Sequence, residues 1–453
     1  MSDTQVKVAV IGAGSAGTFA AFDLYKRFGD KVALTIYERN HRAGGRAWDV
    51  DFAGATIEVG GTLLHSSGRH TMELMEFTGA KEGVPGVSVD GDAETYAFWT
   101  KKGFPVFTKT SLFAMATGIL KHVGPLSALR VTNAATGMSS NWESIYDLQD
   151  QGKSYATTDD MLRDMGLLEV TRTPLHEFLR KKHVNKRMAV DIVEPIIHNM
   201  YNQGLELNAF AGLVGLAGAG LAGGYLFAIE GGNWSLFQRA VEKITTDVRF
   251  DTSVASIDVV TSDEAPSSFS VTTASGSTDT YDLVVLAAPP TLSGIEVRQN
   301  AEKVPITVNP YQEVRTTLVV GDLNPHYFHA NPNKELPSTI FTADSTGAPF
   351  QSIGVTGYSP QYQSRIYKIF SADHYMTSEE LSHIFSDVRD VYDFSWPGAY
   401  PVLNPDIEHV PFEILPGLYF ANAFETAAGS IEVEAVSGVN AARVAAHYLE
   451  KLI

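Results

Sequence analysis

The stretch "VKVAVIGAGSAGTFAAFDLYKR", residues 6–27, predicts a unit that binds a dinucleotide. Its first six residues are typical of a buried strand, and a helix is expected from Ser15 onward. Gly12, Gly14 and Gly17 match G-x-G-x-x-G, in which the first glycine closes the turn, the second lets backbone approach a pyrophosphate, and the third packs the helix on the strand. Free N–H groups at the helix start, around Ser15 and Ala16, then point at the phosphates.

An acidic side chain follows this unit at the spacing that a dinucleotide site requires. "KVALTIYERN", residues 31–40, is typical of a second strand ending at Glu38. A carboxylate there accepts hydrogen bonds from the adenosine ribose. Arg39, the next residue, is a further candidate contact to the cofactor.

Two more glycine-rich loops indicate that the cofactor is FAD. "HRAGGRAWDV", residues 41–50, continues the phosphate-binding surface with Gly44, Gly45 and Arg46. "IEVGGTLLH", residues 57–65, adds Gly60, Gly61 and Thr62. Such loops suit a long, extended cofactor whose far end is a flavin.

Three later segments agree with a flavin site. "GLYFANAFETAAGSIEVEAVSGVNAARVAAHYL", residues 417–449, predicts a strand, a loop and a helix from near Ile431, whose backbone N–H groups would stabilise negative charge on the flavin. We expect Asn422, Glu425 and Glu432 beside it. "YDLVVLAAPP", residues 281–290, predicts a strand that places Ala288 next to the isoalloxazine, and the Val254 backbone in "VRFDTSVASIDVV", residues 248–260, would contact adenine.

Composition excludes several other functions. The 453 residues contain 52 acidic and 34 basic side chains, a net charge of -18 that disfavours nucleic acid as a partner. There is no cysteine, so disulfides, thiol catalysis and cysteine-based zinc sites are excluded. The thirteen histidines show no H-E-x-x-H motif or close ligand pair, and we expect no metal. The N-terminal residues lack the pattern of a signal peptide, which predicts a cytoplasmic protein.

The apolar stretch "AFAGLVGLAGAGLAGGYLFAI", residues 209–229, is long enough to span a membrane. Its six glycines weaken a helix, each by about 1 kcal/mol relative to alanine. Its flanks are Glu206 and Glu230, with no basic residue to set an orientation. We therefore expect no stable membrane insertion, and interpret the stretch as a closely packed core helix that also forms the wall of a pocket for an apolar substrate.

The motifs together resemble the flavin amine oxidase superfamily, on "GAGSAG", "GGR", "VVLAAPP" and "ANAFE…IEVEAVSG". Within it, the chain is similar along nearly its whole length to prenylcysteine oxidases (prenylcysteine lyases). "IEVGGTLLH", "EPIIHNMYNQGLELNAF" and "FAIEGGNWSLFQ" carry that similarity. It makes His65, Tyr201, Gln203 and Asn208 candidate catalytic residues. The wider resemblance makes Lys368 a candidate to hold a water near the flavin.

The resemblance implies an oxidase of prenyl thioethers with FAD as cofactor. A hydride passes from the prenyl C1 to the flavin, water adds, and a prenyl aldehyde and a free thiol are released. Oxygen then accepts the electrons and becomes hydrogen peroxide. The partners would be an apolar small molecule and oxygen. Alternatives are an amine oxidase or desaturase acting on another apolar substrate, and a non-catalytic prenyl-binding protein. An aromatic cage over the flavin would favour amines, and a long tunnel would favour prenyl tails.

The fold expected from this similarity is α/β: a Rossmann-like FAD-binding domain of the glutathione reductase/amine oxidase type, with an inserted α+β substrate domain. We expect the FAD-binding domain to comprise residues 1–85, 225–300 and 405–453. The substrate domain would comprise residues 86–224, with helical spacing of apolar residues, and 301–404, with the alternation of strands.

Overall fold

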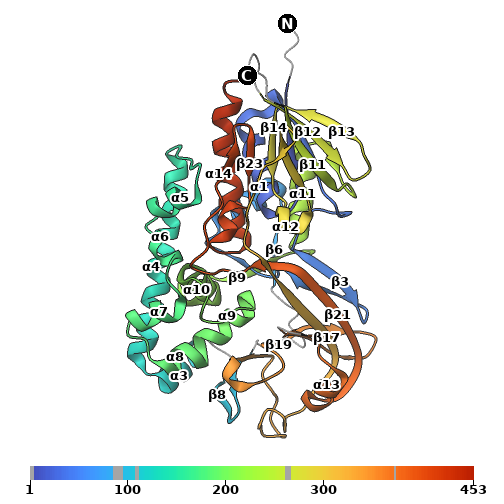
Figure 1. Ribbon diagram of the computed structural model, residues 1–453. Coiled ribbons are helices and arrows are strands. Elements are labelled where there is room, and N and C mark those ends of the chain that lie inside the picture. The colour runs from blue at the N-terminus through green and yellow to red at the C-terminus, as the bar shows by residue number, and fades with distance from the viewer. Residues whose placement is uncertain (1–4, 85–94, 108–111, 261–266, 372–373) are drawn as a thin grey trace.

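The protein has a Rossmann-like part and an inserted α+β part, which meet end to end in the computed structural model (Figure 1). Both termini lie at the far end of the Rossmann-like part. In the inserted part, helices lie on one side and a large sheet on the other. The structure describes residues 5–84, 95–107, 112–260, 267–371 and 374–453.

The Rossmann-like part is organised around a mostly parallel sheet. Its central strand β1 is buried and pairs in parallel with β2 on one side and β14 on the other. Parallel strands buried on both faces read as continuous apolar runs, as "VAVI" and "LVVL" do here. In spatial order the strands are β10 (Asp247–Arg249), β2 (Val32–Tyr37), β1 (Val6–Ile11), β14 (Leu283–Leu286), β23 (Leu418–Phe420) and β22 (Glu413–Leu415).

Two helices from opposite ends of the chain pack on this sheet in direct contact: α1 (Ser15–Phe28) and α14 (Ile431–Leu449). A β-carbon at Gly17 would overlap the carbonyl oxygen of Gly12, and one at Gly438 would overlap that of Ala16. The Ser15 hydroxyl donates to the carbonyl oxygen of Ile431 at 3.0 Å. The N-termini of the two helices therefore meet at the glycine-rich turn.

Smaller elements complete the Rossmann-like part. A second sheet contains β13 (Thr278–Tyr281), β12 (Ser268–Thr273), β11 (Val254–Val260), β15 (Glu296–Gln299) and β16 (Glu302–Lys303). The remaining helices are η1 (Gly29–Lys31), α2 (Arg69–Thr78), α11 (Trp234–Ile244), α12 (Pro290–Ser293) and η6 (Ala423–Thr426). Short strands link the two parts: β3 (Trp48–Phe52), β4 (Ala55–Gly60), β5 (Leu64–His65), β6 (Glu82–Gly83) and β9 (Leu226–Ile229).

The inserted part contains the expected mixture of helices and strands. The strands form one sheet, in the order β21 (Phe385–Pro401), β17 (Tyr311–Leu323), β20 (Ser364–Ser371), β19 (Ser352–Ser359), β18 (Thr339–Thr342), β7 (Tyr96–Thr100) and β8 (Gly103–Phe107). The helices are α3 (Leu112–Val123), α4 (Pro125–Asp150), α5 (Thr158–Asp164), α6 (Leu168–Thr171), α7 (Leu175–Lys181), α8 (Lys186–Met188), η3 (Ala189–Val193), α9 (Glu194–Tyr201), α10 (Ala209–Leu216), η4 (Ala217–Leu221), η5 (Asp344–Thr346) and α13 (Ser378–Ile384).

The apolar stretch 209–229 forms α10, η4 and β9. Side chains fill the space beside the glycines of α10: a β-carbon at Gly212 would lie 2.5 Å from Leu175, and one at Gly215 would lie 3.1 Å from Ile197. The prediction of a closely packed core helix is confirmed for α10. The expectation that the small residues of α10 leave open space for a pocket is not met beside Gly212 and Gly215, because neighbouring side chains fill that space. Among the described helices, none is long and apolar enough to cross a membrane.

Candidate functional site

Two glycine loops form a cradle at the carboxyl end of β1. Gly12 has a φ of +109°, and a β-carbon there would lie 2.8 Å from the carbonyl oxygen of Ala287. The N–H of Gly44 donates to the carbonyl oxygen of Ala13 at 2.9 Å, which ties the second loop to the first. A β-carbon at Gly45 would lie 2.9 Å from the α-carbon of Gly14. Only glycine lets the two backbones approach this closely.

Glu38 lies at the end of β2, as predicted, and braces this cradle. Its buried carboxylate accepts hydrogen bonds from the N–H of Ala13 at 2.9 Å and from the side chain of Asn40 at 2.8 Å. Burial raises the pKa of Glu38, and the donated hydrogen bonds oppose that shift. Arg39, the other predicted contact on this segment, is exposed.

A charged cluster joins the second loop to the C-terminal loop. The guanidinium of Arg46 forms an ion pair with Glu425 and donates to the carbonyl oxygen of Ala399 at 2.8 Å. The Tyr311 hydroxyl donates to the other oxygen of Glu425 at 2.8 Å. The side chain of Glu425 is only 2% exposed, so this pair is largely shielded from water.

Buried polar atoms beside this cluster have no protein partner. Glu434, in the first turns of α14, accepts a hydrogen bond from the amide of Asn422 at 2.9 Å. Its other oxygen and the amide oxygen of Asn422 have no hydrogen-bond partner among the described residues. Burial raises the pKa of Glu434 well above its ordinary value, and the charge of Glu425 adds to the shift. Buried polar atoms without protein partners need a partner from water or from a ligand.

The third glycine loop lies against the second. A β-carbon at Gly61, where φ is +61°, would lie 2.9 Å from the α-carbon of Ala47, and one at Gly60 would lie 2.5 Å from the carbonyl oxygen of Arg46. Thr62 follows and is half-buried. His65 is also half-buried, with its ring nitrogens 2.7 Å from the Ser67 hydroxyl and 3.0 Å from the carbonyl oxygen of Gly223.

Buried Tyr201 and half-buried Tyr400 form an aromatic pair next to the loop before α14. Their ring centres are 5.3 Å apart and the rings meet edge to face at 79°. A β-carbon at Gly429 would lie 3.3 Å from the Tyr400 ring. The Tyr201 hydroxyl is fully buried and has no hydrogen-bond partner among the described residues. Burial raises the pKa of both tyrosines, so both hydroxyls stay neutral.

The side-chain amides of Gln203 and Asn208 form hydrogen bonds with backbone groups of neighbouring segments. Gln203 accepts from the N–H of Leu403 at 2.9 Å and donates to the carbonyl oxygen of Pro401 at 3.1 Å. Asn208 caps α10 by accepting from the N–H of Ala211 at 2.8 Å, and donates to the carbonyl oxygen of Ala427 at 2.9 Å. These contacts position the strands and loop near the tyrosine pair, and a catalytic role for either residue stays a prediction.

Glu432 turns away from the cradle toward α2. Its carboxylate accepts from the N–H groups of His70 at 2.9 Å and Thr71 at 3.0 Å, and from the hydroxyl of Tyr146 at 2.8 Å. The side chain is thus a cap for α2. The sequence placed Glu432 beside the flavin, but its carboxylate binds the start of α2 instead. The backbone of Ile431, the first residue of α14, does lie at the cradle.

The last predicted contacts lie on strands or at strand ends. Ala288 is the second residue after β14 and is half-buried. Val254 is buried at the first position of β11, opposite Thr273. Lys368, from β20, donates to the carbonyl oxygen of Glu58 at 3.1 Å. Burial lowers the pKa of Lys368 to about 8, and the charge of Glu58 opposes the shift.

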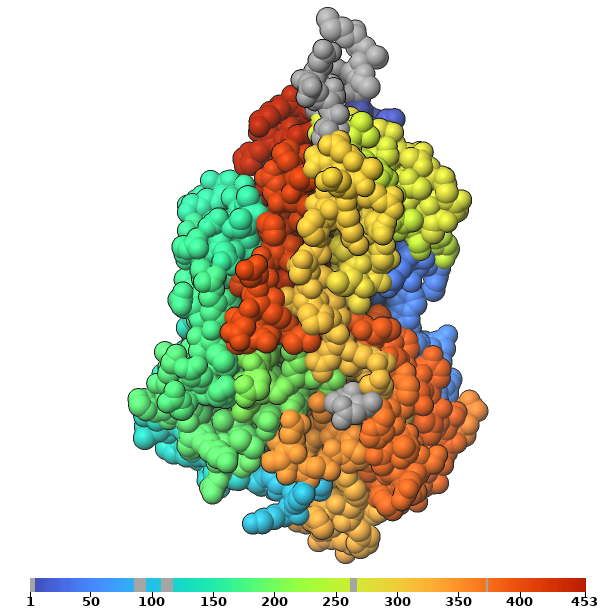
Figure 2. Space-filling model, viewed as in Figure 1, coloured from blue at the N-terminus to red at the C-terminus, as the bar shows by residue number. Residues whose placement is uncertain are grey.

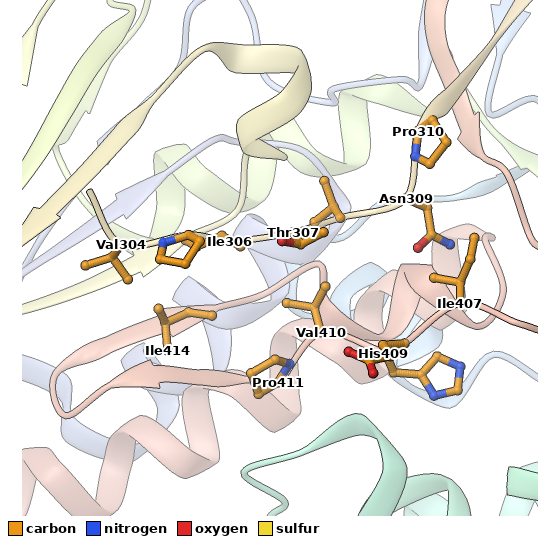
Figure 3. Close-up of a pocket in the computed structure, with 13 residues that line it drawn as sticks. Val304, Ile306, Thr307, Asn309, Pro310, Ile407, His409, Val410, Pro411 and Ile414 are labelled. Atoms are coloured by element: carbon orange, nitrogen blue, oxygen red, sulfur yellow. The ribbon is translucent and has the colours of Figure 1, made fainter. Parts of the chain in front are cut away.

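A cavity of about 580 Å³ lies between the two segments that connect the Rossmann-like and inserted parts. Figure 3 shows residues 304–310 and 407–414 running along its two sides, with Ile306, Val410 and Ile414 among the side chains that face it. In Figure 2, the yellow and red segments that lead into this region run side by side on one face of the molecule. Its lining is mainly aliphatic.

Comparison with known proteins identifies the family. The profile described as Prenylcysteine lyase matches residues 108–452, and an NAD(P)-binding Rossmann-like domain matches residues 10–77. The chain belongs to the prenylcysteine lyase family. Farnesylcysteine lyase of Arabidopsis thaliana is 27% identical over 460 residues, covering 98% of this chain and 88% of that protein. Prenylcysteine oxidase 1 of Bos taurus is 28% identical, covering 97% and 88%.

Solved structures agree on the fold of this prenylcysteine lyase family member. Wild-type putrescine oxidase bound to putrescine superposes with a TM-score of 0.63 at 16% identity, covering 99% of this chain and 99% of that one. Cyclohexylamine oxidase from Brevibacterium oxydans IH-35A gives 0.63 at 15% identity, covering 99% and 100%. The Rossmann-like fold with an α+β insertion, expected from the sequence, is confirmed.

The family member is an FAD-dependent oxidoreductase, and its own residues fit that cofactor. The close approach of the two glycine loops is what a pyrophosphate site requires, and Glu38 follows β2, where an acid is expected to meet the ribose. The ion pair of Arg46 and Glu425 lies near the N-terminus of α14. The oxygens of Asn422 and Glu434 that have no partner among the described residues lie near the same pair. These residues would hold the phosphates of the cofactor and supply polar partners to it.

Two residues of the candidate site, Tyr311 and Glu434, were not predicted from the sequence. Tyr311 lies outside every motif, and only folding brings β17 to Glu425. Glu434 is the second acid of "IEVEAVSG", and its position between Val433 and Ala435 in the first turns of a helix was an available signal. An acid buried in such a helix needs a partner.

Proposed function

We propose that this protein is an FAD-dependent prenylcysteine oxidase that cleaves the thioether between an isoprenoid and cysteine. The observation that carries the proposal is the extent of the family match, residues 108–452. That range includes most of the inserted part, which lies outside the dinucleotide-binding unit matched at residues 10–77. A match limited to the glycine loops would support only the cofactor.

The chemistry of a thioether suits the side chains at the tyrosine pair. The sulfur lone pair stabilises the cation left on C1 when a hydride departs, so the step needs no strong base. Tyr201, which is buried, and Tyr400, which is half-buried, are both neutral and supply an apolar surface, and the Tyr201 hydroxyl has no partner among the described residues. FAD, when bound, accepts the hydride. Water then adds to C1, the carbon–sulfur bond breaks, and the products are a prenyl aldehyde, cysteine and, from oxygen, hydrogen peroxide.

Amine oxidation has less support from the geometry. A cationic amine is held by aromatic faces that enclose it. Tyr201 and Tyr400 instead meet edge to face at 79°, which leaves no paired faces between these two rings. A non-catalytic prenyl-binding role has less support still, because the glycine cradle and the Arg46–Glu425 pair fit the cofactor.

The test is an anaerobic absorbance titration of the yellow holoenzyme with S-farnesylcysteine. We expect the flavin band to bleach and to return with release of hydrogen peroxide when air is admitted. The control is S-farnesylcysteine sulfone, which has the same tail but lacks the sulfur lone pairs. A flavin bleached by cyclohexylamine or putrescine and left unchanged by the thioether would refute the proposal.

A further inference from the structure

Three side chains outside the cofactor site converge where α9 packs on the turn after β18. Glu194 and His198 are four residues apart on α9, so they lie on the same face of the helix. Asp344 begins η5. One ligating atom from each residue lies within 4.8 Å of the other two, and His198 Nε2 is 3.4 Å from Asp344 Oδ1.

The environment of His198 fixes which ring nitrogen carries the proton. Nδ1 lies 3.4 Å from the carbonyl oxygen of Thr342, and a carbonyl oxygen can only accept. In the neutral ring, therefore, Nδ1 donates and Nε2 presents a lone pair. The side chain is only 2% exposed, so Nε2 is aimed at the two carboxylates and is largely shielded from water.

With the ring neutral and Nδ1 protonated, this arrangement places three acceptors together with no donor. No hydrogen bond from the described residues other than His198 reaches the carboxylate of Glu194 or Asp344. A lone pair facing two negative groups is repulsive unless a cation lies between them. The cation can be a proton on Nε2 or a metal ion.

We propose that Glu194, His198 and Asp344 bind one divalent transition-metal ion of the Zn²⁺ type. Two ligands bound at about 2.0–2.1 Å to a tetrahedral zinc lie roughly 3.3 Å apart, which matches the 3.4 Å between His198 and Asp344. Imidazole selects zinc and its neighbours over magnesium and calcium, and two carboxylates balance the charge of the ion. The contact from Nδ1 to a carbonyl oxygen is the usual support for a ligating histidine.

The surroundings leave room for the ion and a water. A β-carbon placed at Gly204 would be 3.9 Å from both His198 Nε2 and an oxygen of Asp344, and the Asp344 side chain is 72% exposed. The exposed side provides the entry path and the fourth ligand. Because α9 ends at Tyr201, the bound ion would hold this helix against the sheet of the inserted part.

The expectation of no metal overlooked one ligand spacing in the sequence. "EPIIH", residues 194–198, places a glutamate and a histidine at i and i+4, which is also a ligand spacing on a helix. The third ligand comes from a distant turn, and only the fold brings it close.

The experiment is calorimetric titration of the full-length protein with ZnCl₂ after treatment with EDTA and dialysis, together with metal analysis of the complex. We expect one zinc per chain, and a dissociation constant at least about tenfold higher in Asp344→Asn. Asp344 is exposed, so this variant keeps the fold, which circular dichroism verifies. The matched control is Glu206→Gln, which alters the exposed pair of His176 and Glu206, 3.3 Å apart, and should bind zinc like the wild type.

Two results would overturn the proposal. Absence of stoichiometric zinc binding by the wild type would mean that a proton on His198 satisfies the two carboxylates. Equal affinity in the wild type and Asp344→Asn would place the bound zinc elsewhere. Glu194→Gln provides a second variant on α9, expected to weaken binding in the same direction.

Discussion

The guanidinium of Arg46 and the carboxylate of Glu425 form an ion pair that joins the second glycine loop to the loop before α14. Glu425 also accepts a hydrogen bond from Tyr311 at 2.8 Å. Three distant segments of the chain therefore depend on one buried carboxylate. The pair lies where the phosphate loops meet the C-terminal helix, so its loss affects both stability and cofactor binding.

Glu425→Gln should lower the free energy of unfolding by about 2–3 kcal/mol, because it leaves the Arg46 charge without its partner. Urea unfolding of the FAD-free protein measures this effect. The control is Asp322→Asn, which removes an exposed pair with Arg389 and should change stability by no more than about 0.5 kcal/mol. Equal effects in the two variants would contradict a buried, supporting role for Glu425.

Gly14→Val should abolish FAD binding and leave the apoprotein folded. The φ of Gly14 is −76°, and a β-carbon there would lie 3.6 Å from Gly45, which is ordinary contact. The added methyl groups therefore enter the space of the pyrophosphate without disrupting the backbone. The readouts are the flavin absorbance and the circular dichroism of the purified protein. Gly137→Val, at an exposed helical position with open space, should remain yellow.

Glu432→Ala should destabilise the protein by about 2 kcal/mol, since it removes the cap of α2 and the partner of Tyr146. Because the side chain turns away from the cradle, FAD affinity should change less than about threefold at temperatures where the variant is folded. Urea unfolding and a fluorescence titration with FAD measure the two effects. Glu450→Ala, at the exposed end of α14, serves as the control. A large loss of FAD affinity with an unchanged free energy of unfolding would show that Glu432 belongs to the cofactor site.

Lys368 should make stability depend on pH between about 8 and 10.5. Its pKa in the folded protein, about 8, lies below that of the unfolded chain. In this range the unfolded state binds more protons, so stability rises with pH, by about 3 kcal/mol at most. Lys368→Met should remove the rise and stabilise the protein below pH 8. Lys303→Met, at an exposed position, should leave the profile unchanged.

Tyr201→Phe should raise KM for S-farnesylcysteine about tenfold with little change in kcat, if the unpartnered hydroxyl binds the amino-acid end of the substrate. The same change should not lower stability, because it removes a buried hydroxyl that lacks a protein partner. Steady-state peroxide release and urea unfolding measure the two effects. Tyr419→Phe, in the Rossmann-like sheet, is the control. An unchanged KM would place the hydroxyl outside the substrate site.

Features set by neighbouring residues were predictable from the sequence. The strand β1, the turn at Gly12 and the helix α1 follow from local hydrophobicity and glycine spacing, and Glu38 follows at the end of the next strand. The start of α14 at Ile431 was also predicted. Each of these depends on contacts between residues close in the chain or within one βαβ unit.

Features set by packing between distant segments were not predictable. Nothing in "IEVEAVSG" shows that Glu432 faces α2 whereas Glu434 faces Asn422, because both depend on how α14 is rotated against its neighbours. The glycines of α10 suggested an open pocket wall, yet Leu175 and Ile197 fill the space beside them. The amides of Gln203 and Asn208 look the same in sequence whether they bind substrate or hold backbone.

The backbone contact between α1 and α14 has a consequence for biosynthesis. A ribosome releases α1 long before α14, the helix that covers it, and β22 (Glu413–Leu415) and β23 (Leu418–Phe420) are made only shortly before α14. The Rossmann-like sheet therefore stays incomplete until these late segments have been made, and until then apolar surface on α1 is exposed. The inserted part, encoded in between, has most of its strands available earlier. Cofactor capture is consequently a late event, and a nascent chain stalled before residue 431 should require chaperone protection.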